Sequence, residues 1–129
     1  MSQAGRPIVA VFDPEPVIRD LYRAIFAGEG YAVAEADALT PSIVRAGASA
    51  VVSDISAPTQ AETIAWLRSH RDDPTTARIP VVFCTSDMEI LRACGPELDA
   101  LGAVVLPKPF DLGALLAAVG VSPCEQAAG

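Results

Sequence analysis

Four polar side chains stand at the ends of short apolar runs that are spread along the whole chain. They are Asp13, Asp54, Thr85 and Lys108. Two neighbouring carboxylates repel each other unless a cation compensates, and a lysine or a magnesium ion supplies that positive charge. Phosphoryl transfer needs an in-line nucleophile, positive charge on the phosphoryl oxygens and a placed hydrogen-bond donor. The four side chains together offer this chemistry, with Asp54 as the nucleophile.

Taken singly, each of these residues has a simpler explanation. Asp, Ser and Thr after a strand commonly cap a helix or form a turn. A functional site therefore depends on a fold that brings all four side chains to one place.

Short apolar runs alternate with segments of helical periodicity, which predicts a parallel sheet covered by helices on both faces. This rhythm suits a flavodoxin-like α/β three-layer sandwich, with a five-stranded parallel sheet of order 2-1-3-4-5 and five helices. Ligands of such sheets bind beyond the carboxyl ends of the strands, where the four polar side chains fall. The expected strands are 8–12, 31–34, 50–53, 81–84 and 103–106, and the later helices are 40–46, 61–68, 88–94 and 112–119.

The clearest helix follows Pro16, a residue type favoured in the first helical turn. Val17, Leu21 and Ile25 repeat there at helical spacing. Gly28 follows as a stop signal. We therefore expect the first helix directly after the first strand.

The composition indicates one well-packed domain. The chain has 129 residues, of which 51% are apolar, and it contains no apolar run of membrane-spanning length. Its net charge of −7 repels nucleic acid and anionic membranes, so we expect neither as a partner. The first residues lack the basic and apolar parts of a secretion signal, so we expect a cytoplasmic protein.

Several residues with chemical potential have plainer interpretations. The stretch SHRDDPTTAR at 69–78 is polar throughout, and we expect it to be an exposed loop with His70 and Arg71 in solvent. Trp66 is expected to cover the core from the third helix. The cysteines are odd in number and far apart, which argues against disulfides and zinc, and we interpret the first two as core thiols. They are Cys84, Cys94 and Cys124.

Four segments resemble the successive strand-end motifs of response-regulator receiver domains, the signalling modules of two-component systems. They are VAVFDPEP, VVSDISAP, VVFCTS and GAVVLPKPF. The resemblance covers nearly the whole chain and implies the receiver type of the flavodoxin-like fold. It implies that Asp54 is the phospho-acceptor and that Thr85 and Lys108 complete the site. It further implies a cis peptide bond between Lys108 and Pro109.

The resemblance also implies a magnesium ion held by Asp13, Asp54 and the backbone carbonyl of Ser56. The family normally has a second acid after the first strand, and Pro14 stands at that position. Because this ligand is lost, we expect magnesium to bind weakly. Glu15 is a candidate substitute, although a surface charge in the first helical turn is the favoured interpretation.

Two further positions depart from the family pattern. Residues 59–62, TQAE, replace the glycines that relatives usually have beside the acceptor, so the loop is expected to take another path. Val105 stands where the family often has an aromatic residue that moves with Thr85 on activation. A valine side chain is short and rotationally restricted, so we expect weaker coupling to the distant face.

These expectations divide the chain into an N-terminal extension (1–6), a receiver domain (7–120) and a flexible C-terminal tail (121–129). A stand-alone receiver would take its phosphoryl group from a histidine kinase or a phosphotransfer protein and signal through contacts with a downstream protein. It would be a regulatory domain rather than an enzyme. We also expect a homodimer through the face formed by the fourth helix, the fifth strand and the fifth helix.

A second hypothesis is a pseudo-receiver, which keeps the fold as a protein-interaction module without regulated phosphorylation. Retention of Asp54, Thr85 and Lys108 favours the phospho-acceptor, whereas Pro14 favours the pseudo-receiver. A nucleotide or flavin binder is disfavoured, because no glycine-rich phosphate loop follows the first strand.

Overall fold

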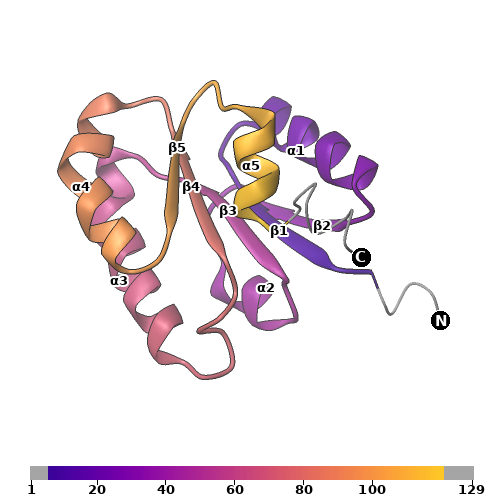
Figure 1. The fold of residues 1–129 in the computed structure, drawn as a ribbon, viewed down its shortest axis with the longest axis horizontal. Helices are drawn as coiled ribbons and strands as arrows, with labels where there is room; N and C mark the ends of the chain where they lie inside the picture. Colours follow the sequence, from indigo (N-terminus) through magenta and orange to yellow (C-terminus); the bar gives the residue numbers. More distant parts are fainter. Residues whose placement is uncertain (1–5, 121–129) are drawn as a thin grey trace.

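Five parallel strands form one sheet in the order β2-β1-β3-β4-β5, and helices cover both of its faces (Figure 1). The computed structural model describes residues 6–120. The predicted flavodoxin-like α/β sandwich is therefore confirmed. The strands are β1 (Ile8–Phe12), β2 (Ala32–Ala36), β3 (Ala50–Asp54), β4 (Val81–Thr85) and β5 (Val104–Pro107). The helices are α1 (Pro16–Gly28), α2 (Pro41–Arg45), the 3-10 turn η2 (Ala57–Thr59), α3 (Gln60–Asp72), α4 (Met88–Ala100) and α5 (Leu112–Ala118).

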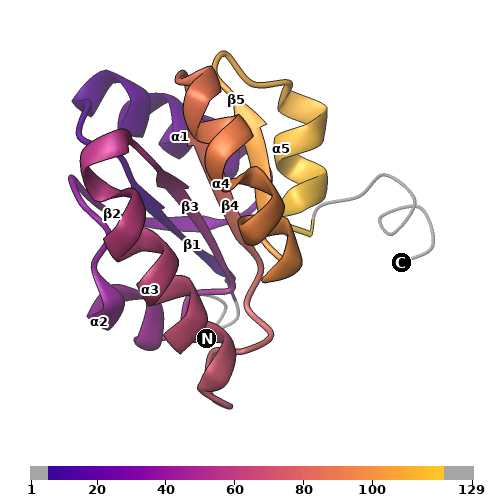
Figure 2. The same ribbon diagram turned by 90° about the vertical axis from the view of Figure 1, so that its left-hand side faces the viewer.

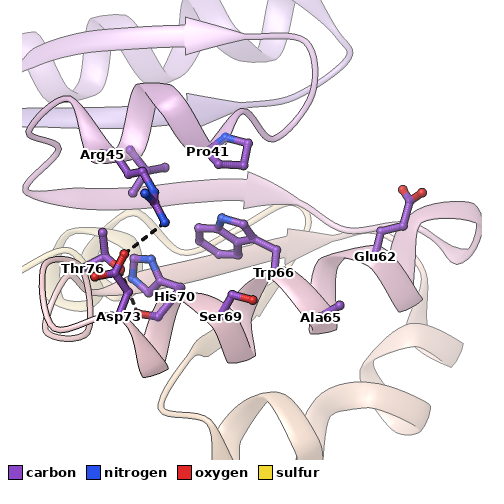
Figure 3. Close-up of a pocket in the computed structure, with 10 residues that line it drawn as sticks. Pro41, Arg45, Glu62, Ala65, Trp66, Ser69, His70, Asp73 and Thr76 are labelled. Atoms are coloured by element: carbon purple, nitrogen blue, oxygen red, sulfur yellow. Dashed lines mark hydrogen bonds and ion pairs between the residues drawn. The ribbon is translucent and has the colours of Figure 1, made fainter.

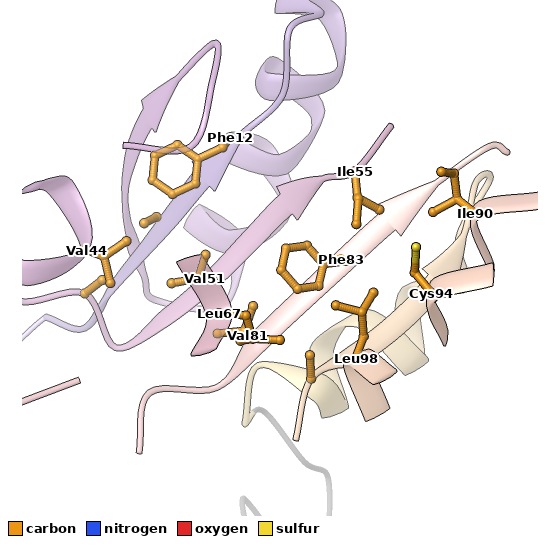
Figure 4. Packing of buried hydrophobic residues seen from close by; sticks show 13 residues of the cluster. Phe12, Val44, Val51, Ile55, Leu67, Val81, Phe83, Ile90, Cys94 and Leu98 are labelled. Carbon is orange, nitrogen blue, oxygen red and sulfur yellow. The ribbon is translucent and has the colours of Figure 1, made fainter. Parts of the chain in front are cut away.

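The sheet has a core layer on each face. Helices α1 and α5 lie on one side of the sheet, and α2, α3 and α4 lie on the other (Figures 1 and 2). Successive side chains of a strand point to opposite faces. Val9 and Val11 accordingly join the layer under α1 and α5, whereas Ala10 and Phe12 join the layer under the other three helices (Figure 4). Both faces of the central strands are thus buried, as a parallel sheet requires.

Helices α3 and α4 run beyond residues 68 and 94, where their periodicity had been expected to end. In each helix the buried stripe continues along the chain. Leu67 and His70 extend it in α3, and Leu98 follows Cys94 in α4. Pro96 lies inside α4, and we attribute its tolerance there to the burial of neighbouring side chains, which offsets the hydrogen bond that proline lacks.

His70 is buried, so the expectation of a solvated loop histidine is wrong. The side chain belongs to α3 and is only 4% exposed. Its ring centre lies 4.7 Å from that of Trp66, and its Nε2 lies 3.1 Å from the Ile79 carbonyl oxygen. Burial lowers the pKa of His70, which favours the neutral imidazole. His70 and Thr76 of this stretch make internal hydrogen bonds, whereas Asp72, Thr75 and Arg78 are exposed.

Arg71 was also expected in an exposed loop, and this too is wrong. It lies partly buried near the end of α3. Its Nε donates to the carbonyl of Leu101 at 2.7 Å and its Nη2 to that of Gly102 at 3.0 Å. Its Nη1 donates to the carbonyls of Ala77 at 2.8 Å and Ile79 at 3.0 Å. The guanidinium thereby joins the segment before β4 to the turn before β5.

The helix predicted after Pro16 is confirmed as α1, but its buried side chains are not those of the predicted repeat. Val17 and Leu21 are 75% and 46% exposed. Tyr22 and Phe26 are buried instead, with ring centres 6.3 Å apart. The larger aromatic side chains therefore set the rotation of the helix, because they bury more apolar surface.

The remaining expectations on the core are confirmed. Cys84 and Cys94 are buried thiols, and Trp66 packs partly buried against the layer under α2, α3 and α4. Cys124 and the expected tail lie outside the described residues, as does most of the expected N-terminal extension. Among residues 6–120, none of the helices has the length and apolar character needed to cross a membrane.

Replacing Arg71 by methionine is expected to lower the free energy of unfolding by about 2–3 kcal/mol, because four carbonyls lose a charged donor. Urea denaturation at pH 7 measures the change. Arg78→Met is the matched control, since Arg78 is exposed, and its change should stay within about 0.5 kcal/mol. Equal losses in the two variants would contradict the structural role given to Arg71.

Candidate functional site

The carboxyl ends of four strands meet at one edge of the sheet and bring the predicted site residues there. Asp13 directly follows β1, and Lys108 directly follows β5. Asp54 and Thr85 are the last residues of β3 and β4, not the first residues beyond them as expected. The difference arises because each ladder continues for one more residue: Asp54 pairs with Cys84, and Thr85 pairs with Pro107.

The ammonium group of Lys108 bridges the two aspartates. Its Nζ lies 2.9 Å from Asp13 Oδ2 and 2.8 Å from Asp54 Oδ1. The side chains of Lys108, Asp13 and Asp54 are 16%, 1% and 22% exposed, so the bridge is largely shielded from water. Burial alone lowers the pKa of Lys108, but hydrogen bonds and charges from both aspartates outweigh it and raise the pKa overall. Lys108 is therefore positively charged at neutral pH.

Both carboxylate oxygens of Asp13 are engaged. Oδ2 accepts from Lys108, and Oδ1 accepts from the backbone N–H of Glu15 at 2.9 Å. Asp13 thus forms a local turn at the start of α1, as aspartates commonly do. Arg19 donates to the backbone carbonyl of Asp13 at 2.7 Å and fixes the same corner. This carboxylate is held in place as the anchor of Lys108.

Thr85 lies at the same edge and is buried. Its hydroxyl oxygen accepts from the backbone N–H of Asp87 at 3.0 Å. A threonine hydroxyl has one proton to donate, and this contact does not use it. The carbonyl of Thr85 accepts from the backbone N–H of Lys108 at 2.8 Å. This bond fixes beside β4 the start of the loop after β5, which we call the lysine loop.

Ser56, the third expected metal ligand, offers a carbonyl that is already hydrogen-bonded. It accepts from the backbone N–H of Thr59 at 3.1 Å and from its hydroxyl at 3.2 Å. These bonds close η2, so the loop beside Asp54 turns around Thr59. Among residues 6–120, no group of three or more His, Cys, Asp or Glu side chains is placed to hold a metal ion. The residues present therefore fit magnesium poorly.

Two stacked aromatic rings support the lysine loop. The Lys108–Pro109 bond is cis, as the resemblance implied. Phe110 stacks on Tyr22, with ring centres 5.4 Å apart and planes 12° apart. The buried Tyr22 hydroxyl has the Cys84 thiol as a neighbour, and burial raises the pKa of both groups. No motif singled out Tyr22, because its role depends on contacts between α1, β4 and the loop.

A hollow of about 490 Å³ opens beside Asp54, on the side turned to α3. Leu39 and Pro58 are among its apolar walls, and Asp37 and Glu62 contribute carboxylates. No sequence pattern predicts this hollow, because its walls come from the ends of β1, β2 and β3, the loops that follow them and the start of α3. It leaves Asp54 approachable from a face that Lys108 does not occupy.

Comparison with known proteins identifies the fold. No protein-family model and no curated protein matches the chain. Among solved structures, it is similar to the chemotaxis protein CheY4 of Vibrio cholerae, with 20% identity over 88% of this chain and 95% of that chain and a TM-score of 0.69. It is also similar to a response regulator receiver protein from Pseudomonas putida (24% identity, 89% and 96% covered, TM-score 0.70) and to the signal receiver domain of an HD domain-containing protein from Pseudomonas fluorescens (20% identity, 96% and 99% covered, TM-score 0.69). The chain therefore has the fold of response-regulator receiver domains, which confirms at the level of the fold the resemblance seen in the strand-end motifs.

Replacing Lys108 by methionine is expected to lower the free energy of unfolding by about 2–4 kcal/mol at pH 7, because two shielded carboxylates lose their shared cation. Chemical denaturation measures the loss. Asp54→Asn in the Lys108→Met background should recover part of it, since one of the two repelling charges disappears. Additive losses from the two substitutions would show that the bridge does not govern stability at this edge.

Proposed function

We propose that this chain is a receiver domain that accepts a phosphoryl group on Asp54 from a histidine kinase or a phosphotransfer protein. The observation that carries the proposal is the bridge from Lys108 to Asp13 and Asp54 at the carboxyl edge of the sheet. A lysine in this position offsets the charge of the nucleophile and lies within reach of incoming phosphoryl oxygens. The receiver fold supports the same role.

In the proposed reaction, a carboxylate oxygen of Asp54 attacks phosphorus in line with the bond to the donor's imidazole nitrogen. An O–P bond forms and the N–P bond breaks, with its electron pair remaining on nitrogen. Lys108 stabilises the negative charge that collects on the phosphoryl oxygens. The hydroxyl proton of Thr85 is available to one of those oxygens, and Asp13 keeps the lysine in place.

Magnesium would add positive charge when bound, but the residues present do not form a ready site. We propose that it binds weakly, through Asp54, the carbonyl of Ser56 and a water-mediated contact to Asp13. Pro14 supplies no oxygen in its side chain, and Asp13 has both carboxylate oxygens engaged. The protein's own cation, Lys108, therefore carries more of the charge compensation.

We propose a regulatory role in the cytoplasm, in which the output passes through contacts with a downstream protein rather than through an enzymatic reaction. Val104 of β5 and Leu112 of α5 are exposed apolar side chains. They support the expected homodimer through the face of α4, β5 and α5, because exposed apolar side chains favour protein contacts.

A pseudo-receiver is the second candidate function. Pro14 at the second acidic position and the engaged oxygens of Asp13 favour it, because both weaken the metal site. In that case Lys108 would serve the stability of the sheet edge alone. Phosphorylation chemistry separates the two candidates.

Incubation with acetyl phosphate or phosphoramidate and magnesium is expected to add the mass of one phosphoryl group. Intact-mass spectrometry, performed quickly because acyl phosphates hydrolyse, detects the adduct. Asp54→Ala should abolish it, since the nucleophile is removed. Asp37→Ala is the matched control, because Asp37 lines the same hollow, and it should leave the adduct in place. Failure of the unaltered protein to gain mass would favour the pseudo-receiver.

Pro14→Asp is expected to tighten magnesium binding at least about tenfold, because a hard cation gains an oxygen ligand at the same strand end. Isothermal titration calorimetry compares the dissociation constants of the two proteins. Glu15→Gln should leave the affinity unchanged if Glu15 is a surface charge. Equal affinity before and after Pro14→Asp would mean that Pro14 does not occupy the position of the second acid.

A further inference from the structure

Two hollows lie along α3, one beside Asp54 and one between α2 and α3. The hollow of about 490 Å³ beside Asp54 forms one half, and a hollow of about 460 Å³ between α2 and α3 forms the other (Figure 3). Glu62 lines both hollows, so they adjoin. We name the whole the α2–α3 groove and define it by Asp54, Leu39, Glu62, Trp66 and Asp73. It exists because α2 has five residues and covers little of the 13-residue α3.

The walls of the α2–α3 groove include apolar side chains in both hollows. Leu39 and Pro58 line the half near Asp54. Pro41 of α2 and Trp66 of α3 line the other half (Figure 3), and so does Val44. Apolar walls of this kind are typical of interaction sites on a protein surface.

The charges along the α2–α3 groove are almost all negative. Asp37 and Glu62 contribute exposed carboxylates, and Asp54 and Asp73 stand toward its two ends. Arg45 is the one cation among the residues lining the two hollows, and it pairs with Asp73 at 3.1 Å. Asp54 is already paired with Lys108, and Asp73 is paired with Arg45. A cationic group in the groove would therefore meet the exposed carboxylates of Asp37 and Glu62, together with an indole that attracts cations.

We propose that the α2–α3 groove docks a segment of a partner protein that carries arginine or lysine next to apolar side chains. The apolar side chains of that segment would contact Leu39, Pro41 and Trp66. Its cations would pair with Glu62 and Asp37. This surface is separate from the face of α4, β5 and α5.

Other occupants fit the groove less well. Residues 1–5 and 121–129 contain no lysine or arginine, so neither end of the chain supplies the complementary charge. A second copy would bring another net charge of −7 against the same acidic rim. Nucleic acid and anionic membranes are repelled for the same reason.

Phosphorylation would strengthen this docking, a step that rests on the proposed function. Asp54 forms part of the groove wall. An aspartyl phosphate there adds negative charge at one end of the groove, and a basic segment binds more tightly to a more acidic surface. Signalling by charge in this way would not require an aromatic side chain at Val105.

The test uses a synthetic helical peptide of leucine, alanine and arginine, and a counterpart with glutamate in place of arginine. Isothermal titration calorimetry at low salt should show binding of the arginine peptide alone. Glu62→Lys should weaken it by about tenfold or more. Glu89→Lys is the matched control, because Glu89 is likewise exposed in the first turn of a helix but lies on α4, and it should change affinity by less than about twofold.

Three results would overturn the groove proposal. Equal weakening by the two lysine substitutions would mean that overall charge alone attracts the peptide. Unchanged affinity in Trp66→Leu, verified as folded by circular dichroism, would mean that the indole takes no part. Self-association that Glu62→Lys abolishes, seen by sedimentation, would assign the groove to a second copy.

The phosphorylation step is tested separately with beryllium fluoride and magnesium. Binding of beryllium fluoride, detected by fluorine NMR, should tighten the arginine peptide by about threefold or more. If beryllium fluoride binds without changing peptide affinity, the proposed coupling between phosphorylation and docking is wrong. If it does not bind at all, the proposed function fails, whereas docking is judged on the unmodified protein.

Discussion

The edge of the sheet that carries the site depends on one shared cation, the ammonium group of Lys108. Parallel strands bring their carboxyl ends together, and the adjacent β1 and β3 place Asp13 and Asp54 side by side. Adjacent strands lie only about 4.8 Å apart, so two ionised carboxylates there repel each other. Lys108, which directly follows β5, hydrogen-bonds to both carboxylates. The backbone hydrogen bond from Lys108 to Thr85 and the stacking of Phe110 on Tyr22 hold it in that position.

How much of the fold and of the site could be predicted from the sequence depends on whether each residue's partners lie near it in the chain. Short apolar runs define the strands, and the residues just after each run mark the sheet edge, so local pattern alone predicts the positions of Asp13 and Lys108. The expectation of an exposed loop is wrong for His70 and Arg71, because their hydrogen-bond partners are not local in the chain. The carbonyl that holds His70 is nine residues away, and Arg71 reaches a carbonyl 30 residues away. A run of polar residues looks like an exposed loop unless those distant partners are known.

The expected magnesium ligands illustrate a second limit of prediction, which arises from competition for oxygen atoms. Residue types at Asp13 and Ser56 suit a hard cation, and the resemblance to receiver domains points to them. The structure shows that Glu15 and Thr59 already use those oxygens through local turns. Polar side chains and nearby backbone groups commonly satisfy each other in this way. The identity of a residue alone therefore does not predict how strongly its oxygens bind a cation, because local hydrogen bonds compete for them.

The division of the core into two layers also separates the chain's chromophores. Both of its tyrosines, Tyr22 and Tyr31, belong to the layer under α1 and α5, and its single tryptophan, Trp66, packs against the opposite layer. Tryptophan emission thus reports on the α2, α3 and α4 side, and tyrosine absorbance reports on the other. In a cooperative transition the two signals change together. A loosening confined to one side of the sheet would separate them, so the unlabelled protein can reveal which of its two layers melts first.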